Sequence, residues 1–364
     1  MSVTLDHVSQ TVDGITTIRD VSLTLERGSL SVLLGPTLAG KTSIMRLLAG
    51  LDKPAQGRVL VDGKDVTGID IRKRSVAMVY QQFINYPSLT VYENIASPLR
   101  VQGKPKAEIE TRVREAAALL KLEPYLDRTP LQLSGGQQQR TAIARALVKG
   151  ADLVLLDEPL ANLDYKLREE LRTELPKIFE ASGAIFVYAT TEPSEALLLG
   201  GRTACLWEGE VLQFGETPKV YRRPDTLKVA EVFSDPPLNS AGIEKKGDSV
   251  HYAGGVTAPA SGLYAQLPDG AYRIGFRAHQ LGLGSAAADG RVFPAKHVFP
   301  AEVTVTEITG SESFTHVRHG QSNWVSVLQG IHEFASGDRL DAVLDPGNVF
   351  IFDSSDRLVA APAM

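Results

Sequence analysis

One stretch of eight residues constrains the fold of this chain more than any other. The residues GPTLAGKT, Gly35 to Thr42, fit the pattern G-x-x-x-x-G-K-[ST]. They follow a short apolar run, Val32 to Leu34, and precede Ser43 to Ala49, which has the pattern of a helix that ends at Gly50. Backbone amides in a loop between a strand and a helix can hold phosphate oxygens. A glycine-rich turn formed by chance is the alternative, and the flanking pattern argues against it.

The loop and the start of the helix are therefore predicted to bind a nucleotide. Lys41 is expected to reach the β- and γ-phosphates, and Thr42 is expected to ligate Mg²⁺. The predicted nucleotide-binding residues of this segment are Gly35, Pro36, Thr37, Leu38, Ala39, Gly40, Lys41, Thr42 and Ser43.

Residues 1 to about 235 alternate apolar runs with helical patterns. Apolar residues recur at helical spacing from Ala107 to Leu120, and an Asp62-Gly63 turn signal lies within Val59 to Lys64. The buried-strand candidates are Val76 to Tyr80, Leu153 to Leu156 and Ile185 to Tyr188. This alternation predicts an α/β domain over 1–235, with a largely parallel sheet covered on both faces. A helical subdomain is expected at about 86–150.

The sequence changes character after residue 235. The turn-rich segment Ser234 to Gly242 is followed by short alternating runs such as Glu302 to Ile308 and Asp341 to Leu344. These runs predict a small all-β, OB-like domain over 236–364. From Ala241 onward, nine Lys and Arg stand against thirteen Asp and Glu, so we expect no nucleic acid partner.

Two further motifs carry chemistry. In LVLLDEP, Leu153 to Pro159, a buried strand would deliver Asp157 to the Mg²⁺ shell, and Glu158 could polarise the attacking water as a general base. In LSGGQQQR, Leu133 to Arg140, Ser134 is a natural N-cap and the glycines open a second anion-binding helix start. One nucleotide does not need two such helix starts. The second is simply explained if it serves a nucleotide held by another subunit.

These motifs, with Gln81 and the LANLD segment that ends at Asp164, resemble in order and spacing the ATPase subunit of an ABC transporter. The distal segments GFRAHQL, Gly275 to Leu281, and VFIFDSSDRL, Val349 to Leu358, resemble the regulatory β-domain of the carbohydrate-importer branch. The resemblance is to the maltose and glycerol-3-phosphate type of that branch, and within it the chain resembles the ATPase subunit of a glycerol importer. The resemblance covers nearly the whole chain.

The resemblance implies a head-to-tail pair of ATPases, with each ATP between one subunit's phosphate loop and the other's LSGGQ. Catalytic roles would fall to Glu158, Gln81 and Thr191, and Mg²⁺ would be held by Thr42, Gln81 and Asp157. Facing the partner's nucleotide would be Ser134, Gly135, Gly136, Gln137 and Asp164. The cofactors implied are ATP and Mg²⁺.

The resemblance also implies partners and a location. The chain would sit peripherally on the cytoplasmic face of the membrane, bound to transmembrane permease subunits, with an extracytoplasmic solute-binding protein in the complex. The stretch QFINYPSLTVYENI would dock the permease. Its aromatics, Phe83, Tyr86 and Tyr92, are equally well explained as core residues.

Three positions depart from the family pattern. Thr191 stands where a histidine is usual, and no histidine lies between residues 8 and 250. No aromatic residue precedes Tyr80, so Val12 stands near the place of the usual adenine-stacking ring. Leu38 replaces a usual glycine, where a side chain could crowd the loop or alter its backbone freedom.

These departures predict a weakened site on this chain beside an intact signature helix, and hence an asymmetric pair with a non-identical partner. Because Glu158 is retained, some ATP hydrolysis at this site is compatible with the sequence. Pairing with an identical chain is also compatible with it.

The alternative function is a soluble ABC-type ATPase switch that acts without a transporter. An exporter is disfavoured, because no permease is fused to the chain and the tail resembles importers. No window of eighteen uninterrupted apolar residues occurs, so a membrane role would need a partner.

Overall fold

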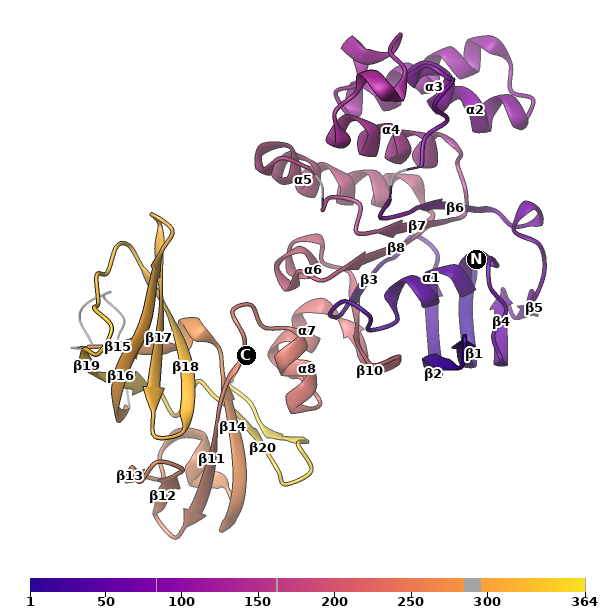
Figure 1. Ribbon diagram of the computed structural model, residues 1–364. Helices are drawn as coiled ribbons and strands as arrows, with labels where there is room; N and C mark the ends of the chain where they lie inside the picture. The colour runs from indigo at the N-terminus through magenta and orange to yellow at the C-terminus, as the bar shows by residue number, and fades with distance from the viewer. Residues whose placement is uncertain (83, 162, 285–295, 364) are drawn as a thin grey trace. The chain divides into compact units, whose positions relative to one another are not determined.

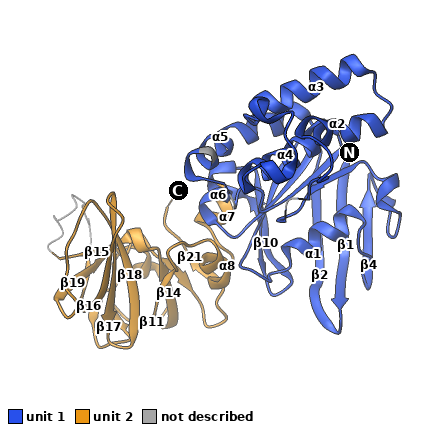
Figure 2. Ribbon diagram, turned by 45° about the horizontal axis from the view of Figure 1, so that its top comes forward, with its two compact units in different colours: residues 1–217 blue, residues 218–364 orange. Residues whose placement is uncertain are grey.

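The structure is a computed structural model that describes residues 1–82, 84–161, 163–284 and 296–363. The chain divides into two compact units, Met1–Thr217 and Pro218–Met364 (Figure 2). Each unit has its own hydrophobic core. Within the described parts of the chain, no helix has both the length and the apolar composition needed to cross a bilayer.

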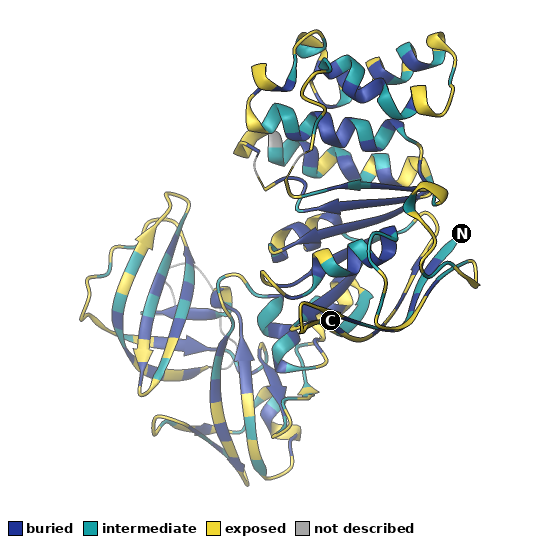
Figure 3. Ribbon diagram, turned by 45° about the vertical axis from the view of Figure 1, so that its right-hand side comes forward, coloured by how far each residue is buried: buried dark blue, intermediate teal, exposed yellow. Residues whose placement is uncertain are grey.

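The first unit is built on a six-stranded sheet. Its strand order is β10-β9-β3-β8-β7-β6, and all neighbours are parallel except β9 and β10. The strands are β3 (Leu30–Leu34), β6 (Val76–Val79), β7 (Leu153–Asp157), β8 (Ile185–Thr190), β9 (Arg202–Trp207) and β10 (Glu210–Glu216). The prediction of apolar strands in a largely parallel sheet is confirmed: every residue of β7 and β8 is buried (Figure 3).

Helices cover this sheet on both faces. On one face, α1 (Lys41–Ala49) buries Ile44 and Leu47 in a core shared with Val187 of β8. On the other face, Phe186 of β8 stacks on Phe179 of α5 (Tyr165–Ser182), with ring centroids 4.0 Å apart. α6 (Pro193–Leu199) packs on β3 and β8. Successive side chains of β8 point to opposite faces of the sheet, so Phe186 packs against α5 and Val187 packs in the core that contains α1.

Three helices form a group of their own at one end of this unit, in the range where a helical subdomain was expected (Figure 1). They are α2 (Val91–Val101), α3 (Lys106–Leu119) and α4 (Gly135–Val148), joined through the 3₁₀ turns Glu123–Tyr125 and Pro130–Gln132. The expected apolar stripe of α3 is buried, including Ile109 and Val113. A further 3₁₀ turn, Ile71–Lys73, precedes β6.

A second, antiparallel sheet completes the first unit. It has the order β2-β1-β4-β5 and consists of β1 (Ser2–Val12), β2 (Ile15–Glu26), β4 (Gln56–Val61) and β5 (Lys64–Asp65). Asp13 and Gly14 both have positive φ, 50° and 80°, as the tight turn between β1 and β2 requires. β2 lies beside the phosphate loop, because a Cβ on Gly40 would lie 3.0 Å from the carbonyl oxygen of Thr17 in this strand.

The single cysteine, Cys205, lies within β9 and is fully buried. Burial raises the pKa of its thiol to about 12. The thiol is therefore protonated at neutral pH and acts as a small apolar side chain in the sheet.

The second unit begins with two short helices, α7 (Thr217–Arg222) and α8 (Leu227–Val232). Arg277 of the GFRAHQL motif lies 3.5 Å from the ring centroid of Tyr221 in α7, and Leu227 of α8 packs in a cluster with Phe350. Burial lowers the pKa of Arg277 to about 10. The compact units thus divide before these helices, whereas the boundary expected from composition near residue 235 lies after them.

Two antiparallel sheets form the rest of the second unit. The first, in the order β13-β12-β11-β14-β20-β21, consists of β11 (Asn239–Lys246), β12 (Ser249–Tyr252), β13 (Thr257–Pro259), β14 (Gly270–Phe276), β20 (Phe350–Phe352) and β21 (Leu358–Ala360). The second, in the order β15-β19-β16-β17-β18, consists of β15 (Leu281–Leu283), β16 (His297–Ile308), β17 (Glu312–His319), β18 (Ser322–Gln329) and β19 (Arg339–Leu344). Two 3₁₀ turns, Gly262–Gln266 and Ala278–Gln280, lie between strands. Both sheets contribute to one core, which confirms the expected C-terminal β-domain.

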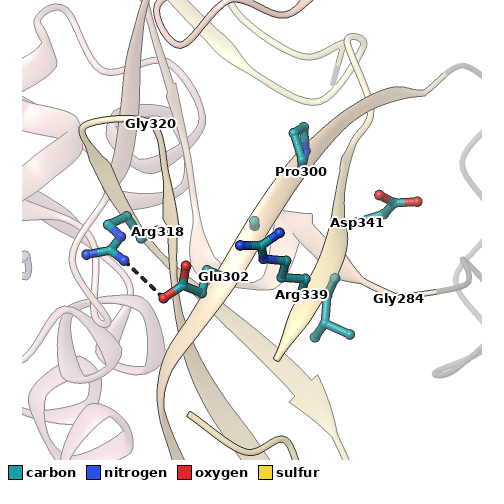
Figure 4. Close-up of a pocket in the computed structure, with 9 residues that line it drawn as sticks. Gly284, Pro300, Glu302, Arg318, Gly320, Arg339 and Asp341 are labelled. Atoms are coloured by element: carbon teal, nitrogen blue, oxygen red, sulfur yellow. Dashed lines mark hydrogen bonds and ion pairs between the residues drawn. The ribbon is translucent and has the colours of Figure 1, made fainter. Parts of the chain in front are cut away.

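A hollow of about 550 Å³ lies on the face of the second of these sheets. Glu302 of β16 has Arg318 and Arg339 as its cross-strand neighbours, and Arg318 donates to Glu302 at 3.0 Å (Figure 4). Both partners of this ion pair are largely in water, where such a pair contributes at most about 1 kcal/mol. The hollow has the character of a solvated sheet face.

Candidate nucleotide-binding site

The loop between β3 and α1 closes around one buried cation. The ammonium of Lys41 donates to the carbonyl oxygens of Gly35 at 2.8 Å and Pro36 at 3.0 Å. A Cβ at Gly35 would lie 2.5 Å from the carbonyl oxygen of Leu206, so only glycine fits there. Gly40 has φ 103°, which again favours glycine. The loop is thus a tight ring of backbone with a positive charge at its centre.

Burial lowers the pKa of Lys41, and its nearest carboxylate oxygen, Oε1 of Glu158, lies 3.6 Å away. Its direct hydrogen-bond partners are neutral carbonyls. An anion entering the ring would compensate the charge better than these carbonyls do, so the ring suits a phosphate group.

Oxygen ligands for a hard cation gather beside the loop. Thr42 Oγ1 donates to Asp157 Oδ2 at 2.8 Å. Asp157 is buried, which raises the pKa of its carboxyl group. Gln81 Nε2 donates to Glu158 Oε2 at 3.0 Å. Hydroxyl, carboxylate and amide oxygens at one edge of the sheet form a donor set that fits Mg²⁺.

The cavity in front of the loop combines polar and aliphatic lining residues. Its volume is about 730 Å³. The polar lining includes Lys41, Thr42, Ser43, Gln81 and Glu158, and Thr37 and Gly40 of the loop also line the cavity. The aliphatic side chains in the lining are Val12, Ile15 and Leu38. A ligand that carries both charged groups and an apolar surface matches this lining.

Leu38 stands out in the loop. It has φ 70°, the left-handed region that a leucine enters at a cost of roughly 1–2 kcal/mol. Its side chain is 95% exposed and lines the cavity. The positive φ agrees with the backbone demand inferred at this position, whereas a side chain this exposed does not crowd the loop.

The tip of β8 lies between the loop and the general-base candidate. The Thr190 carbonyl oxygen accepts from the Gly35 amide at 3.4 Å, and the Ala189 carbonyl oxygen accepts from the Glu158 amide at 3.0 Å. Thr191 follows the strand and is exposed, but it is not among the residues that line the cavity.

The predicted signature residues form a second group. Ser134 caps α4: its hydroxyl accepts from the Gln137 amide at 3.4 Å, and Gln137 Oε1 accepts from the Ser134 amide at 2.9 Å. Ser134 and Gly135 are exposed, as is Asp164. None of Ser134, Gly135, Gly136, Gln137 and Asp164 lines the described cavity.

Several lining residues were not predicted from the sequence. Ile15 and Arg19 come from β2, and Glu208 and Gly209 come from the turn after β9. The Gly209 amide donates to the Ala39 carbonyl oxygen at 3.1 Å, and its own carbonyl oxygen accepts from the Arg19 amide at 2.9 Å. The Asp13-Gly14 pair is a local signal for the hairpin between β1 and β2, but it does not by itself place β2 beside the loop.

A parallel sheet with this loop and this oxygen set defines a P-loop nucleotide-binding protein. A family model described as ABC transporter matches residues 18–161. Among solved structures, a dimeric ATP-binding cassette in a post-hydrolysis state bound to ADP and Pi is 32% identical, with a TM-score of 0.55 over 59% of this chain and 98% of the other.

Curated relatives match nearly the whole chain. The trehalose/maltose import ATP-binding protein MalK of Thermococcus litoralis is 35% identical and covers 94% of each chain. The sn-glycerol-3-phosphate import ATP-binding protein UgpC of Paracoccus denitrificans is 34% identical over 96% of each. The spermidine/putrescine import ATP-binding protein PotA of Aggregatibacter actinomycetemcomitans is 38% identical over 72% of this chain and 71% of its own.

The chain therefore belongs to the ABC transporter family, as an ATP-binding protein with ATPase activity. This confirms the family resemblance inferred from GPTLAGKT, LSGGQQQR and LVLLDEP.

Replacing Leu38 by glycine is expected to raise the free energy of unfolding of the purified chain by about 1 kcal/mol. The free chain already holds Leu38 at positive φ, where leucine loses roughly 1–2 kcal/mol and glycine does not. Leu38→Ala is the matched variant, because it removes bulk and keeps the backbone cost, so its stability should not rise. Chemical denaturation measures both variants, and an equal gain in both would contradict the backbone explanation.

Proposed function

We propose that this chain is the ATP-binding subunit of an ABC importer that takes up a sugar, polyol or glycerol-type solute. The sugar and glycerol-3-phosphate import relatives align over both units, including the C-terminal β-domain, which supports this solute class. The polyamine import relative aligns over a smaller share of the chain.

The residues around the cavity have distinct roles in this proposal. Lys41 neutralises phosphate charge, and the loop amides orient the phosphates. Thr42, Gln81 and Asp157 would hold Mg²⁺, which when bound would neutralise charge on the phosphate oxygens. Glu158 takes a proton from the attacking water, and its hydrogen bond to Gln81 orients the carboxylate.

We infer that the chain is one half of an asymmetric pair. The observation that carries this inference is the contrast between its two half-sites. The chain's own site has Thr191 for the usual histidine, a strained Leu38 and the aliphatic Val12, whereas its signature helix has an intact capping box. Threonine donates a hydrogen bond but carries no positive charge. The own site would bind ATP and hydrolyse it slowly, while Ser134, Gly136 and Gln137 complete the site of a non-identical partner.

A groove on the first unit supports docking of a permease. It has a volume of about 390 Å³ between β6, α2 and α4. Tyr86 and Val101 line it and are 51% and 90% exposed. Arg145 and Lys149 also line it; burial lowers the pKa of both, and they donate to the backbone carbonyls of Ile84 and Val76. A short helix with apolar residues and a carboxylate would complement this groove.

The three aromatic residues of the stretch QFINYPSLTVYENI differ in their surroundings. Tyr86 lines the groove, and the guanidinium carbon of Arg145 lies 5.0 Å from the centroid of the Tyr86 ring. Tyr92 donates to Glu110 at 2.6 Å and lines a different hollow. Phe83 lies outside the described residues. Through this groove the chain would sit peripherally on the cytoplasmic face of the membrane, in a complex that includes an extracytoplasmic solute-binding protein.

Turnover of the purified transporter tests the asymmetry. Glu158→Gln in this subunit alone is expected to leave more than about half of the ATP turnover, whereas the equivalent change in the partner should lower it at least about a hundredfold, as loss of a general base does. Abolition of turnover by Glu158→Gln alone, or a partner that proves identical, would contradict the asymmetric pair. Failure to co-purify with membrane subunits would instead favour the soluble switch.

A further inference from the structure

A buried carboxylate lies behind the tip of β8, away from the nucleotide cavity. Glu195, in the first turn of α6, is 4% exposed. It accepts hydrogen bonds from Thr190 Oγ1 at 2.6 Å, Tyr188 Oη at 3.1 Å and Arg172 Nη2 at 3.1 Å. Burial raises the pKa of Tyr188 well above its usual value, so its hydroxyl remains a donor. The carboxylate is thus fully engaged with β8 and α5.

The contacts continue from Glu195 across α5. Arg172 Nη2 also donates to Glu192 Oε2 at 2.7 Å, and Arg168 Nη1 donates to Glu192 Oε1 at 3.3 Å. Arg168 Nη2 reaches the carbonyl oxygen of Ala161 at 3.2 Å. We call Arg168, Arg172, Glu192 and Glu195 the ionic relay. It spans the start of α5, the loop after β8 and α6.

Each end of the relay meets a segment of the ATPase site. At one end, the Thr190 hydroxyl donates to Glu195 and accepts from the Glu192 amide at 3.0 Å. Thr191 lies between Thr190 and Glu192 in the sequence. At the other end, the Ala161 amide donates to the carbonyl oxygen of Glu158 at 3.3 Å. The relay therefore connects the strand tip with the loop that leaves the general base.

Stability alone does not account for such a cluster. Well-packed apolar residues often stabilise a protein as much as a buried ion pair, because the ions lose their hydration. An ion pair with several directed hydrogen bonds does fix the positions of the segments that it joins. Moving one segment would leave a buried charged group without its partner, which costs free energy. None of the four relay residues lines the cavity, so a direct role in binding ATP is not indicated.

We propose that the ionic relay holds the loop Glu158–Ala161 and the strand tip Ala189–Glu192 as one rigid unit, with Glu195 as its principal positioning residue. A shift of the loop after Glu158 then moves Thr191 with it. The proposal rests on the ATPase role of Glu158 and is independent of whether the pair is asymmetric.

Hydrogen exchange of the full-length chain tests the relay without requiring turnover or a partner. Glu195→Gln and Arg168→Gln alter opposite ends. Each is expected to raise amide exchange about tenfold in both segments, 158–161 and 189–192, because loss of one charged contact loosens both. The amide exchange rates of the double variant should not exceed those of either single variant. ATP affinity should remain within about twofold of the unaltered chain.

Glu169→Gln is the matched control. Glu169 accepts from Arg172 Nη1 at 2.7 Å and is about as exposed as Glu192, but it lies outside the path between the two segments. It should leave both exchange rates unchanged. If Glu195→Gln prevents folding, Glu192→Gln replaces it, because that side chain is 40% exposed. Loosening confined to the altered end, or equal loosening by Glu169→Gln, would overturn the proposal.

Discussion

Ser134→Arg is expected to lower ATP turnover of the assembled transporter at least about a hundredfold, comparable to the loss of an oriented donor at a reacting group. Ser134 is exposed at the start of α4, where helix amides are available to an anion. In the proposed pair, an arginine there would fill the space of the partner's nucleotide. ATP binding by the isolated chain should not change, because Ser134 does not line its cavity.

Two variants separate this effect from simple loss of the helix cap. Ser134→Ala removes the cap at a cost of about 1 kcal/mol and one hydroxyl donor, but it adds no bulk and leaves the helix amides accessible, so it should lower turnover much less than Ser134→Arg does. Thr129→Arg alters a similar capping box at a 3₁₀ turn five residues upstream, and it should retain turnover as well. Equal loss of turnover in all three variants would mean that α4 serves only stability.

Lys41→Ala, unlike Ser134→Arg, is expected to weaken ATP binding by the isolated chain. The isolated chain should lose at least about a hundredfold in ATP affinity, the scale of removing one partner from a buried charged contact. The ring formed by the Gly35 and Pro36 carbonyls would then lack its central cation, and Glu158 would lose the nearest positive charge. Isothermal titration of the purified chain with ATP and Mg²⁺ measures the change.

Lys41→Arg is the companion variant. It keeps the charge, but its planar guanidinium does not fit a ring shaped around an ammonium, so affinity should stay low. Full recovery by arginine would show that charge alone is sufficient. If Lys41→Ala leaves ATP affinity unchanged, the cavity in front of α1 is not the ATP site.

Local features of this fold were predictable from sequence. The phosphate loop and α1, the stripe of α3 and the buried strands β7 and β8 each depend on neighbouring residues, and they occur within one or two residues of the expected limits. The positive φ of Leu38 agrees with the backbone demand inferred at that position. Such features are set by short-range sterics and periodicity.

Features made by distant segments were not predictable in this way. The presence of Ile15 and Arg19 at the cavity depends on how β2 pairs with β1 and on the contact of Gly209 with the loop. The relay joins Glu195 to Arg172, and neither residue has a local signal that identifies the other. The helices α7 and α8 likewise join the C-terminal unit through aromatic contacts that composition does not reveal.

The burial of Cys205 makes this chain a natural background for site-directed labelling. With its only thiol inside β9 and protonated at neutral pH, maleimides and spin labels should leave the native chain unmodified. A cysteine introduced at an exposed position such as Thr191 or Tyr165 would then carry the sole probe. Distances between two such probes, one on each subunit, would follow the opening and closing of the proposed pair without first removing a native cysteine.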